Sequence, residues 1–233
     1  MIIVLGDGLL AAELIGQTGW NYISRKNDGL DFNNLSSLIN LIPDECNTII
    51  NCIAYTDTYS DNKAKMLKTN YHSVANLVDY CNAREIKLIH YSTDYVYAGS
   101  VPNASEHDIP IPDRTWYAYS KLLADEYIIR HSSDYLIVRG SHRINPFPYE
   151  NAWENQIGNF DDVDILVKQW IQLIRNNQKG VWNIGTPTKS VYEYASRERE
   201  VNPMPAPEHF PKDTTMDLTK LNTFLETLLE IEV

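Results

Sequence analysis

The stretch Met1-Ile-Ile-Val-Leu-Gly-Asp-Gly-Leu-Leu-Ala11 opens the chain and decides its fold. Its apolar run predicts a buried strand, and the G-x-G-x-x-A pattern that follows predicts a tight turn into a helix. Gly6 permits the turn, Gly8 lets the backbone approach a pyrophosphate, and the final alanine lets helix and strand pack closely. The first N–H groups of the helix, around Leu9 and Leu10, would face the phosphates. The stretch therefore predicts a dinucleotide-binding unit, with an ordinary strand-to-helix turn as the alternative.

Short apolar runs alternate with helical patterns along the rest of the chain. Strands that are apolar on both faces, separated by amphipathic helices, are typical of a parallel sheet covered by helices on each side. Because crossovers between parallel strands are right-handed, the pattern predicts an α/β fold with a doubly wound, Rossmann-type sheet. The expected strands are residues 2–5, 20–24, 48–53, 87–91, 135–139 and 181–184. The expected helices are residues 9–17, 35–41, 61–82, 117–131, 163–176 and 217–230.

The character of the sequence changes near Gly140. Residues 141–160 are rich in Asn, Pro and aromatic side chains, and the four prolines of residues 200–213 predict an extended loop. We therefore expect a dinucleotide-binding domain over residues 1–140. Residues 141–233 would form a small, reduced substrate-binding region that also contributes the strand at 181–184 and the last helix. This region should cap the carboxyl ends of the strands, where ligands bind in such sheets.

Composition excludes several classes of function. The chain has 20 Lys and Arg against 31 Asp and Glu, and its formal net charge of −11 argues against binding to nucleic acid. No apolar stretch reaches the roughly 20 residues that span a bilayer, and the apolar start lacks the basic leader of a signal peptide. We therefore expect a cytoplasmic protein without a membrane segment. The three cysteines form no CxxC pair and the six histidines show no metal-ligand spacing, so we expect no metal site.

The second expected strand ends at Ser24-Arg25-Lys26. An NAD site usually has an acidic residue here for the ribose 2′-hydroxyl, whereas Arg25 suits a 2′-phosphate. The sequence therefore favours NADPH, with NADH as the alternative. Arg25 and Lys26 can equally be a pair of solvated surface cations.

Three Tyr-x-x-x-Lys patterns occur, and their context distinguishes them. Tyr22 lies in an expected strand, and Tyr59 lies where a loop enters a helix. Tyr117 and Lys121 open an amphipathic helix, on which residues four apart share a face, so a phenol and an ammonium can meet one ligand. Upstream, an apolar strand runs into Ser92-Thr93, which places the Thr93 hydroxyl at the ligand-binding edge of the sheet.

Thr93, Tyr117 and Lys121 have the chemistry that reduction of a ketone by a nicotinamide requires. Hydride addition needs a proton for the developing alkoxide, and a phenol with a pKa near 10 is a usable acid. A Lys121 ammonium nearby would lower that pKa and would also reach the nicotinamide ribose. Thr93 would donate a hydrogen bond to the substrate oxygen. The structural alternative is that Tyr117 only packs under a loop at the start of its helix.

Nine strings spread over nearly the whole chain carry a family resemblance. They are Ile49-Ile-Asn-Cys-Ile-Ala-Tyr-Thr56, Thr69-Asn70, Ser92-Thr-Asp-Tyr-Val-Tyr97, Tyr117-Ala-Tyr-Ser-Lys121, Leu136-Ile-Val-Arg-Gly-Ser141, Asn155-Gln-Ile-Gly158, Trp182-Asn-Ile-Gly185, Ser190-Val-Tyr-Glu-Tyr-Ala195 and Met216-Asp-Leu-Thr-Lys-Leu221. Together they resemble the dTDP-4-dehydrorhamnose reductase family of extended short-chain dehydrogenases/reductases. The resemblance implies an oxidoreductase of deoxysugar biosynthesis that uses NADPH or NADH. Its substrate would be a nucleotide-linked 6-deoxyhexose, and the enzyme would reduce the 4-keto group of that sugar.

The resemblance also implies roles for individual residues. The catalytic set would be Thr93, Tyr117 and Lys121, with Asn70 supporting the active-site helix. The cofactor would lie against Gly6, Gly8, Leu9, Leu10, Arg25, Asp31, Phe32, Ala54, Tyr55, Tyr117 and Lys121, with Asp31 and Phe32 by the adenine. The substrate would meet Asp94, Tyr95, Val96, Arg139, Ser141, His142, Arg143 and Gln156. The chain is a shortened member, because a helix and a strand that the family has between Arg143 and Asn155 are missing.

Two of the substrate residues keep an alternative. Arg139 and Arg143 can hold a diphosphate by bidentate contacts, but Arg139 can equally be a structural ion-pair partner. His142 can touch the substrate or be an ordinary loop histidine.

Two further functions stay open. The first is a nucleotide-sugar epimerase or epimerase/reductase, since the same catalytic set serves that reaction. The second is a non-catalytic subunit that keeps NADP as a structural ligand, as in the regulatory subunit of methionine adenosyltransferase, which belongs to the same family. The two long helices, 61–82 and 117–131, would supply either core packing or a homodimer contact.

Overall fold

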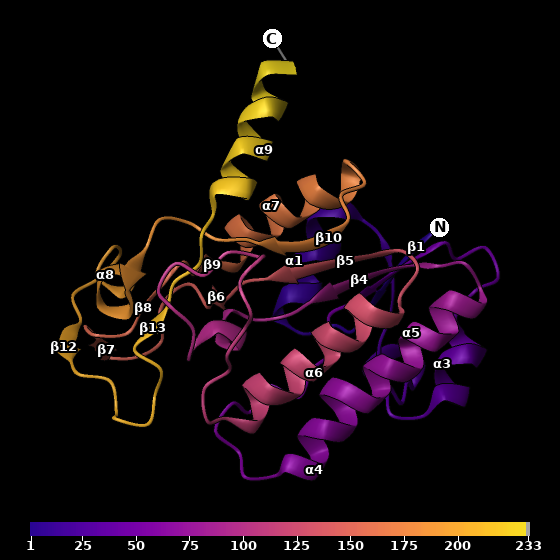
Figure 1. Cartoon of the computed structure of the whole chain (residues 1–233), viewed down its shortest axis with the longest axis horizontal. Coiled ribbons are helices and arrows are strands. Elements are labelled where there is room, and N and C mark those ends of the chain that lie inside the picture. Colours follow the sequence, from indigo (N-terminus) through magenta and orange to yellow (C-terminus); the bar gives the residue numbers. More distant parts are fainter. Residues whose placement is uncertain (232–233) are drawn as a thin grey trace.

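The computed structural model describes residues 1–231 and contains one six-stranded parallel sheet in the order β10-β5-β4-β3-β1-β2 (Figure 1). The strands are β1 (Ile2–Leu5), β2 (Asn21–Ile23), β3 (Thr48–Asn51), β4 (Lys87–Tyr91), β5 (Tyr135–Arg139) and β10 (Gly180–Asn183). The chain starts at β1, adds β2 on one side and then returns to add the other strands on the opposite side. The order therefore reverses between β1 and β3, as in the doubly wound fold that the sequence predicts. Ligands bind at such a reversal.

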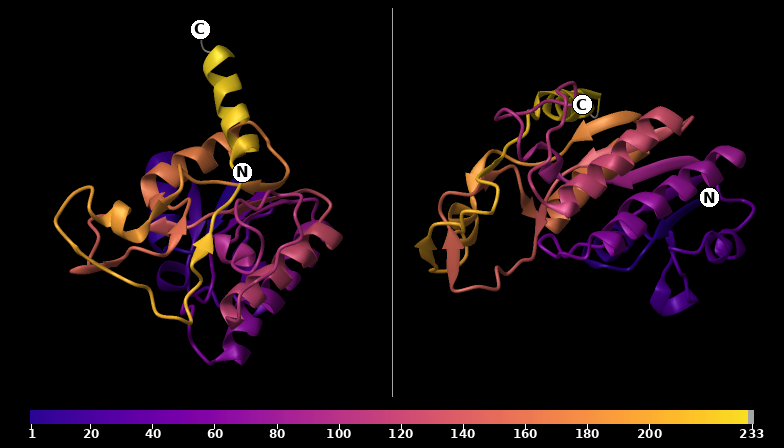
Figure 2. Two further views of the ribbon diagram at one scale, coloured as in Figure 1. Left: turned by 60° about the vertical axis from the view of Figure 1, so that its left-hand side comes forward. Right: turned by 60° about the horizontal axis from the view of Figure 1, so that its bottom comes forward.

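Helices cover both faces of the sheet (Figures 1 and 2). One face carries α1 (Leu9–Thr18) and α7 (Val163–Arg175), together with α9 (Thr219–Ile231), which packs beside β10 and extends away from the body. The other face carries α3 (Leu35–Leu41), α5 (Ser73–Ala83) and α6 (Trp116–His131). Three single-turn helices complete the set: α2 (Arg25–Asp28), α4 (Lys63–Met66) and α8 (Val191–Ala195).

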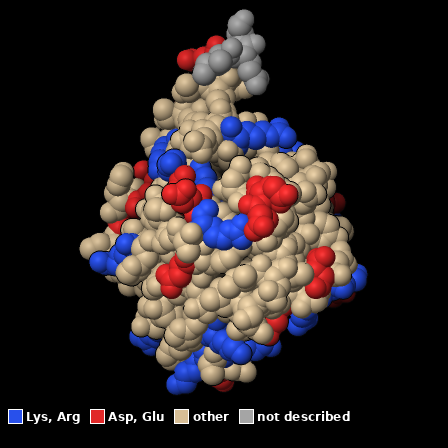
Figure 3. All heavy atoms as spheres, turned by 90° about the vertical axis from the view of Figure 1, so that its right-hand side faces the viewer, with Lys and Arg blue, Asp and Glu red and all other residues tan. Residues whose placement is uncertain are grey.

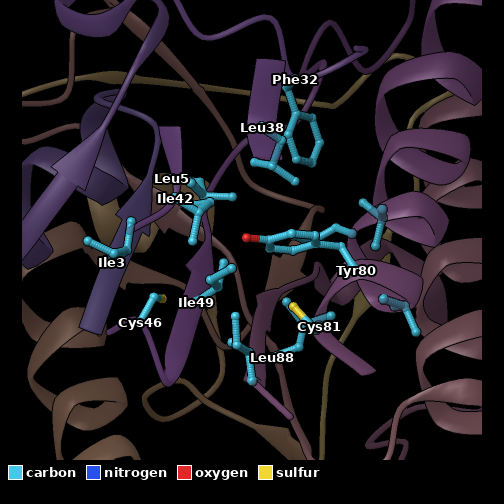
Figure 4. Close-up of a cluster of buried hydrophobic side chains, with 14 of the residues drawn as sticks. Ile3, Leu5, Phe32, Leu38, Ile42, Cys46, Ile49, Tyr80, Cys81 and Leu88 are labelled. Atoms are coloured by element: carbon cyan, nitrogen blue, oxygen red, sulfur yellow. The ribbon is translucent and has the colours of Figure 1, made fainter. Parts of the chain in front are cut away.

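Alternation along the strands divides the core in two. Ile3 and Leu5 pack under the α3, α5 and α6 layer, where Figure 4 shows them with Ile49 and Leu88 facing Tyr80 and Cys81 of α5. Val4, between them in sequence, packs on the opposite face against α1 and α7. Each large apolar side chain buried in this way contributes about 1.5–3 kcal/mol relative to exposure. A polar residue at the end of a strand, on the face that α6 covers, is therefore surrounded by buried apolar side chains.

The expected helix at 61–82 is broken by a wider turn. It consists of α4, a π-helical turn (Leu67–His72) and α5. Periodicity cannot show this insertion, because apolar residues continue at helical spacing on both sides of it. Single π-turns often occur at functional sites, and this one contains the buried Asn70.

The region after β5 returns to the main sheet and also forms a small separate part, at the left of Figure 1. The chain supplies α7, β10 and α9 to the main layers, so both halves of the sequence build the sheet. The small part contains β6 (His142–Arg143), β7 (Asn151–Trp153), β8 (Ile157–Gly158), β9 (Asp161–Asp162), β11 (Lys189–Ser190), β12 (Asn202–Met204) and β13 (Asp213–Thr214). They pair as β11-β8-β13, β12-β7 and β6-β9. A domain boundary at residue 140 stays a prediction.

The prediction of a plain loop over residues 200–213 is wrong in one respect. The segment contains β12, which pairs in parallel with β7 and places Pro203 opposite Ala152. Proline is tolerated there because β12 belongs to a sheet of only two strands, where it needs no N–H donor on its outer side.

Among residues 1–231, no helix is long and apolar enough to cross a lipid bilayer. On the face shown in Figure 3, Lys and Arg are interspersed with Asp and Glu, and no continuous basic surface appears.

Candidate active site

A cleft of about 410 Å³ opens at the carboxyl ends of the central strands. Its walls come from the glycine turn, the loop after β3, the end of β4, the first turns of α6 and the loop after β5. The lining residues include Gly8, Leu9, Leu10, Ala54, Tyr95, Ser141, His142, Arg143 and the predicted catalytic set of Thr93, Tyr117 and Lys121. The structure therefore brings the three catalytic candidates and the glycine turn to one cavity.

The glycine turn has the backbone geometry that a pyrophosphate needs. Gly6 adopts φ +106°, and a Cβ there would lie 3.1 Å from Ile53. At Gly8 a Cβ would meet nothing within 4 Å, so the backbone borders open space. Gly8 is also the N-cap of α1 and supplies no side-chain cap, which leaves the first N–H groups of the helix available to an anion.

Thr93 has an extended backbone and lies after β4, directly before a short 3-10 helix (Asp94–Tyr97). Its Oγ1 accepts a hydrogen bond from the Tyr95 N–H at 3.2 Å and lies 3.2 Å from an Asp94 carboxylate oxygen. Asp94 is buried and accepts from Thr214 Oγ1 at 2.9 Å, which joins the end of β4 to β13 of the small part. Thr93 is thus held rigidly by both neighbours.

Tyr117 projects from the first turn of α6, which Thr115 begins by accepting the Ala118 N–H at 3.1 Å. Burial raises the pKa of the Tyr117 phenol well above its ordinary value, although a hydrogen bond with Thr93 acts to lower it. Tyr117 therefore keeps its proton at neutral pH.

Lys121 lies one turn further along α6 and is only 2% exposed. Its Nζ donates to the Tyr91 carbonyl oxygen at 2.8 Å and lies 3.0 Å from His90 Nε2. Burial lowers the pKa of Lys121 to about 8, although Asp125 acts to raise it. The prediction that Lys121 lowers the pKa of Tyr117 is wrong for this arrangement, because burial raises the pKa of the phenol and Lys121 Nζ is bound to Tyr91 and His90.

Asn70 connects the cleft wall to α6. Its Oδ1 accepts the Tyr55 N–H at 2.7 Å, and its Nδ2 donates to the Tyr55 carbonyl at 3.1 Å and to Ser120 Oγ at 3.0 Å. The π-turn points this buried amide between the loop after β3 and the catalytic helix. Tyr55 itself takes part through its backbone and is not among the residues that line the cleft.

The two arginine candidates separate. Arg139 is 2% exposed, and its guanidinium donates to Asp125 at 3.0 Å and to Tyr97 at 2.6 Å. It has the structural ion-pair role that was its alternative, and it does not line the cleft. Arg143 lines the cleft, stacks 4.2 Å over the Phe160 ring and donates to Ser141 Oγ at 2.8 Å.

A second pocket, of about 860 Å³, adjoins the cleft and shares Thr58, Tyr95 and Arg143 with it. Its walls are rich in aromatic residues from the small part. They include Phe147, Tyr149, Trp153 and Phe210, together with Gln156. His142 lies in the cleft, where burial lowers its pKa to about 4, so its imidazole is neutral.

The remaining predicted residues lie outside both cavities. Asp94 and Val96 are buried, and Phe32 belongs to the core under α3. Gly6 acts through the turn described above. Arg25 and Asp31 are exposed at the ends of β2 and its following turn, beyond the lining of the cleft. Their contact with a cofactor stays a prediction.

Sequence reasoning missed Asn51 and His90, which are both fully buried. They are register partners on β3 and β4, and Asn51 Nδ2 lies 3.1 Å from His90 Nδ1. The available signal was a polar residue at the end of each of two neighbouring apolar strands, which is costly to bury without a partner.

Comparison with known proteins gives a consistent result. The family model for the RmlD substrate-binding domain matches residues 1–143. A probable low-salt glycan biosynthesis reductase of Haloferax volcanii is 32% identical over 114 residues, which cover 47% of this chain and 38% of that protein. The matched segment thus spans little more than a third of this curated relative.

Two solved structures share the fold over nearly their whole length. A hypothetical dTDP-4-dehydrorhamnose reductase from Sulfolobus tokodaii gives a TM-score of 0.83 at 23% identity, covering 96% of this chain and 94% of that one. A dTDP-4-dehydrorhamnose reductase from Bacillus anthracis, in complex with NADP, gives 0.80 at 21% identity, covering 95% and 90%.

Proposed function

Because this chain belongs to the RmlD substrate-binding domain family, whose model matches residues 1–143, we propose that it reduces the 4-keto group of a nucleotide-linked 6-deoxyhexose. The observation that carries the proposal is the convergence of Thr93, Tyr117 and Lys121 in one cleft with the glycine turn. The two solved structures named above, both described as dTDP-4-dehydrorhamnose reductases, support the same reaction.

The cleft fits a nicotinamide dinucleotide. The uncapped N-terminus of α1 and the open space at Gly8 would hold the pyrophosphate. Ala54 lines the same cleft as Gly8 and the catalytic residues and would contact the cofactor there. Arg25, exposed after β2, would meet a 2′-phosphate, which favours NADPH. The NADP complex of the Bacillus anthracis structure supports this choice. When bound, the nicotinamide supplies the hydride.

The catalytic residues then act on the substrate oxygen. Tyr117 donates its proton to the developing alkoxide, and Thr93 stabilises the charge on that oxygen by a hydrogen bond. A buried phenol that keeps its proton is an acid rather than a base. A proton donor beside the substrate oxygen is what the reduction requires.

The second pocket would take the nucleotide part of the substrate. Its aromatic side chains offer faces to a base, and Arg143 at the junction with the cleft can hold the diphosphate through paired N–H groups. Tyr95 and Gln156 would position the sugar and the nucleotide between the two cavities.

The test is NADPH oxidation measured with a panel of nucleotide-linked 4-keto-6-deoxyhexoses. The wild type should consume NADPH with at least one member of the panel. Tyr117→Phe should reduce kcat by about 10²–10⁴-fold while it still binds NADPH, because it removes the proton donor and leaves the cofactor walls intact. Binding of NADPH with no turnover of any ketone would instead favour a regulatory subunit.

We also propose that α5 and α6 form a homodimer contact. Their inner faces pack on the sheet and on each other, while α6 leaves Tyr119 44% and Ile129 36% exposed. Sedimentation velocity should show a dimer, and Ile129→Glu should shift it to the monomer.

A further inference from the structure

A chain of buried hydrogen bonds runs beneath the catalytic helix. It starts at the Ile53 N–H, which donates to Asn51 Oδ1 at 3.0 Å. It continues from Asn51 Nδ2 to His90 Nδ1 at 3.1 Å and from His90 Nε2 to Lys121 Nζ at 3.0 Å. Nζ then donates to the Tyr91 carbonyl oxygen at 2.8 Å. Asn51 and His90 are fully buried, and the reaction described above uses neither of them.

The two ends of this chain fix the direction of its protons. A backbone N–H needs an acceptor, so the amide oxygen of Asn51 faces Ile53 and its NH₂ group faces His90. His90 Nδ1 must therefore be an acceptor. Burial lowers the pKa of His90 well below its ordinary value, so the ring is neutral and carries its proton on Nε2. That proton points at Lys121.

Only a neutral amine on Lys121 can accept a hydrogen bond from the His90 Nε2–H. An ammonium has no lone pair, so two donors would face each other. A neutral amine accepts from His90 and still donates to Tyr91. We infer that Asn51 and His90 are positioning residues that bind Lys121 in its neutral form and so lower its affinity for a proton, and that charging Lys121 breaks its bond to His90 and releases its side chain toward the cleft.

The charges around Lys121 agree with this state. On α6, Asp125 lies one turn away, but its carboxylate already accepts from Arg139 of β5 at 3.0 Å and from Ser92 at 2.9 Å. Tyr117, one turn earlier, keeps its proton. Beside β3, burial raises the pKa of Cys52 to about 12, so its thiol is neutral. An ammonium at this point would have no anion of its own, as expected for a lysine whose pKa is lowered to about 8.

The consequence for function rests on the reductase activity proposed above. The lysine of the cleft would bind cofactor hydroxyls as a charged group only after it takes up a proton and leaves His90. The site would therefore contain a lysine that titrates near neutrality, where the phenol keeps its proton. Asn51 and His90 would set the midpoint of this titration without touching substrate or cofactor.

Nuclear magnetic resonance on the intact protein tests the inference without any turnover. Long-range ¹H–¹⁵N spectra of the histidine rings should show His90, assigned by its loss in His90→Gln, as the neutral Nε2–H tautomer. The Lys121 side-chain resonance, assigned by its loss in Lys121→Met, should titrate near pH 8. An Nδ1–H tautomer, or a lysine midpoint at the ordinary value of about 10.4, would overturn the inference.

Two substitutions reverse the chain. Asn51→Asp turns an acceptor toward His90 Nδ1 and so makes Nε2 accept from a Lys121 ammonium, which should raise the lysine midpoint by about one unit or more. His90→Gln offers an amide oxygen to the ammonium without adding charge, and it should move the midpoint in the same direction. A rise in Asn51→Asp alone would reflect only added charge and would count against the chain. If the wild-type resonances are as predicted but the protein turns over no ketone, the proposed function is wrong and the hydrogen-bond chain from Ile53 to Tyr91 is still supported.

Discussion

Tyr117 and Thr93 show how burial, more than charge, sets the chemistry of single residues in this cleft. The sequence places a lysine four residues after the tyrosine and so suggests a lowered phenol pKa. In the structure, burial instead raises the pKa of the phenol, and Thr93 beside it acts in the opposite direction. The protonated phenol suits the role of an acid. Sequence spacing identified the residues but not the direction of this shift, because burial depends on loops that come from elsewhere in the chain.

Thr93→Val tests the second hydroxyl. Valine keeps the branched shape of the side chain but removes both the donor for the substrate oxygen and the acceptor of the Tyr95 N–H. We expect kcat to fall by about 10²–10³-fold. Thr93→Ser keeps the hydroxyl and should stay within about tenfold of the wild type. Equal turnover in the two variants, measured by NADPH oxidation with one active substrate, would remove Thr93 from the mechanism.

At the scale of elements, local pattern predicted most of the fold. β1, β4 and β5 coincide with the predicted runs, because a short apolar stretch bounded by turns has few other ways to be buried. The π-turn at Leu67–His72 and the strand β12 were not predictable. Both depend on tertiary partners, Ser120 in the first case and β7 in the second, that local sequence does not reveal.

Gly185 tests the packing of β10 against the small part. A Cβ at this position would clash with the Asn159 carbonyl oxygen and lie 2.8 Å from Asn159 Cβ. Gly185→Ala should therefore lower the free energy of unfolding by about 1–3 kcal/mol. Gly16→Ala is the matched control, because the exposed position in α1 has nothing within 4 Å, and it should stabilise by about 0.5–1 kcal/mol. Urea unfolding measures both, and equal effects would contradict the packing described.

At the scale of the whole molecule, the active site depends on the small part keeping its shape beside the sheet. Asp161 of β9 joins separate segments of the small part, since it binds Arg197 at 2.8 Å and Lys189 at 3.0 Å and is 5% exposed. Burial acts to raise the pKa of Asp161, but hydrogen bonds from Arg197, the Asp162 backbone, Lys189 and Thr186 lower it to about 2.

This shift predicts how stability depends on pH. Because the folded-state pKa lies below the unfolded value, the carboxylate stabilises the fold by about 2 kcal/mol above pH 4, and the contribution is lost as pH falls toward 2. Asp161→Asn should therefore be less stable than the wild type at pH 7, with a difference that narrows between pH 5 and pH 2. Asp164→Asn, which removes an exposed pair with Lys168, should cost less than about 0.5 kcal/mol. A difference for Asp161→Asn that is independent of pH would contradict this role of Asp161.

The central claim is that the cleft transfers a hydride to the keto carbon and that Tyr117 protonates the oxygen. The most direct measurement uses NADPH deuterated at its transferable position with a nucleotide-linked 4-keto-6-deoxyhexose, followed by mass spectrometry of the product. We predict a 4-hydroxy sugar that carries one deuterium at C4, formed about 10²–10⁴-fold more slowly by Tyr117→Phe than by the wild type. A recovered ketone without deuterium, or an epimerised sugar without net consumption of NADPH, would contradict the account.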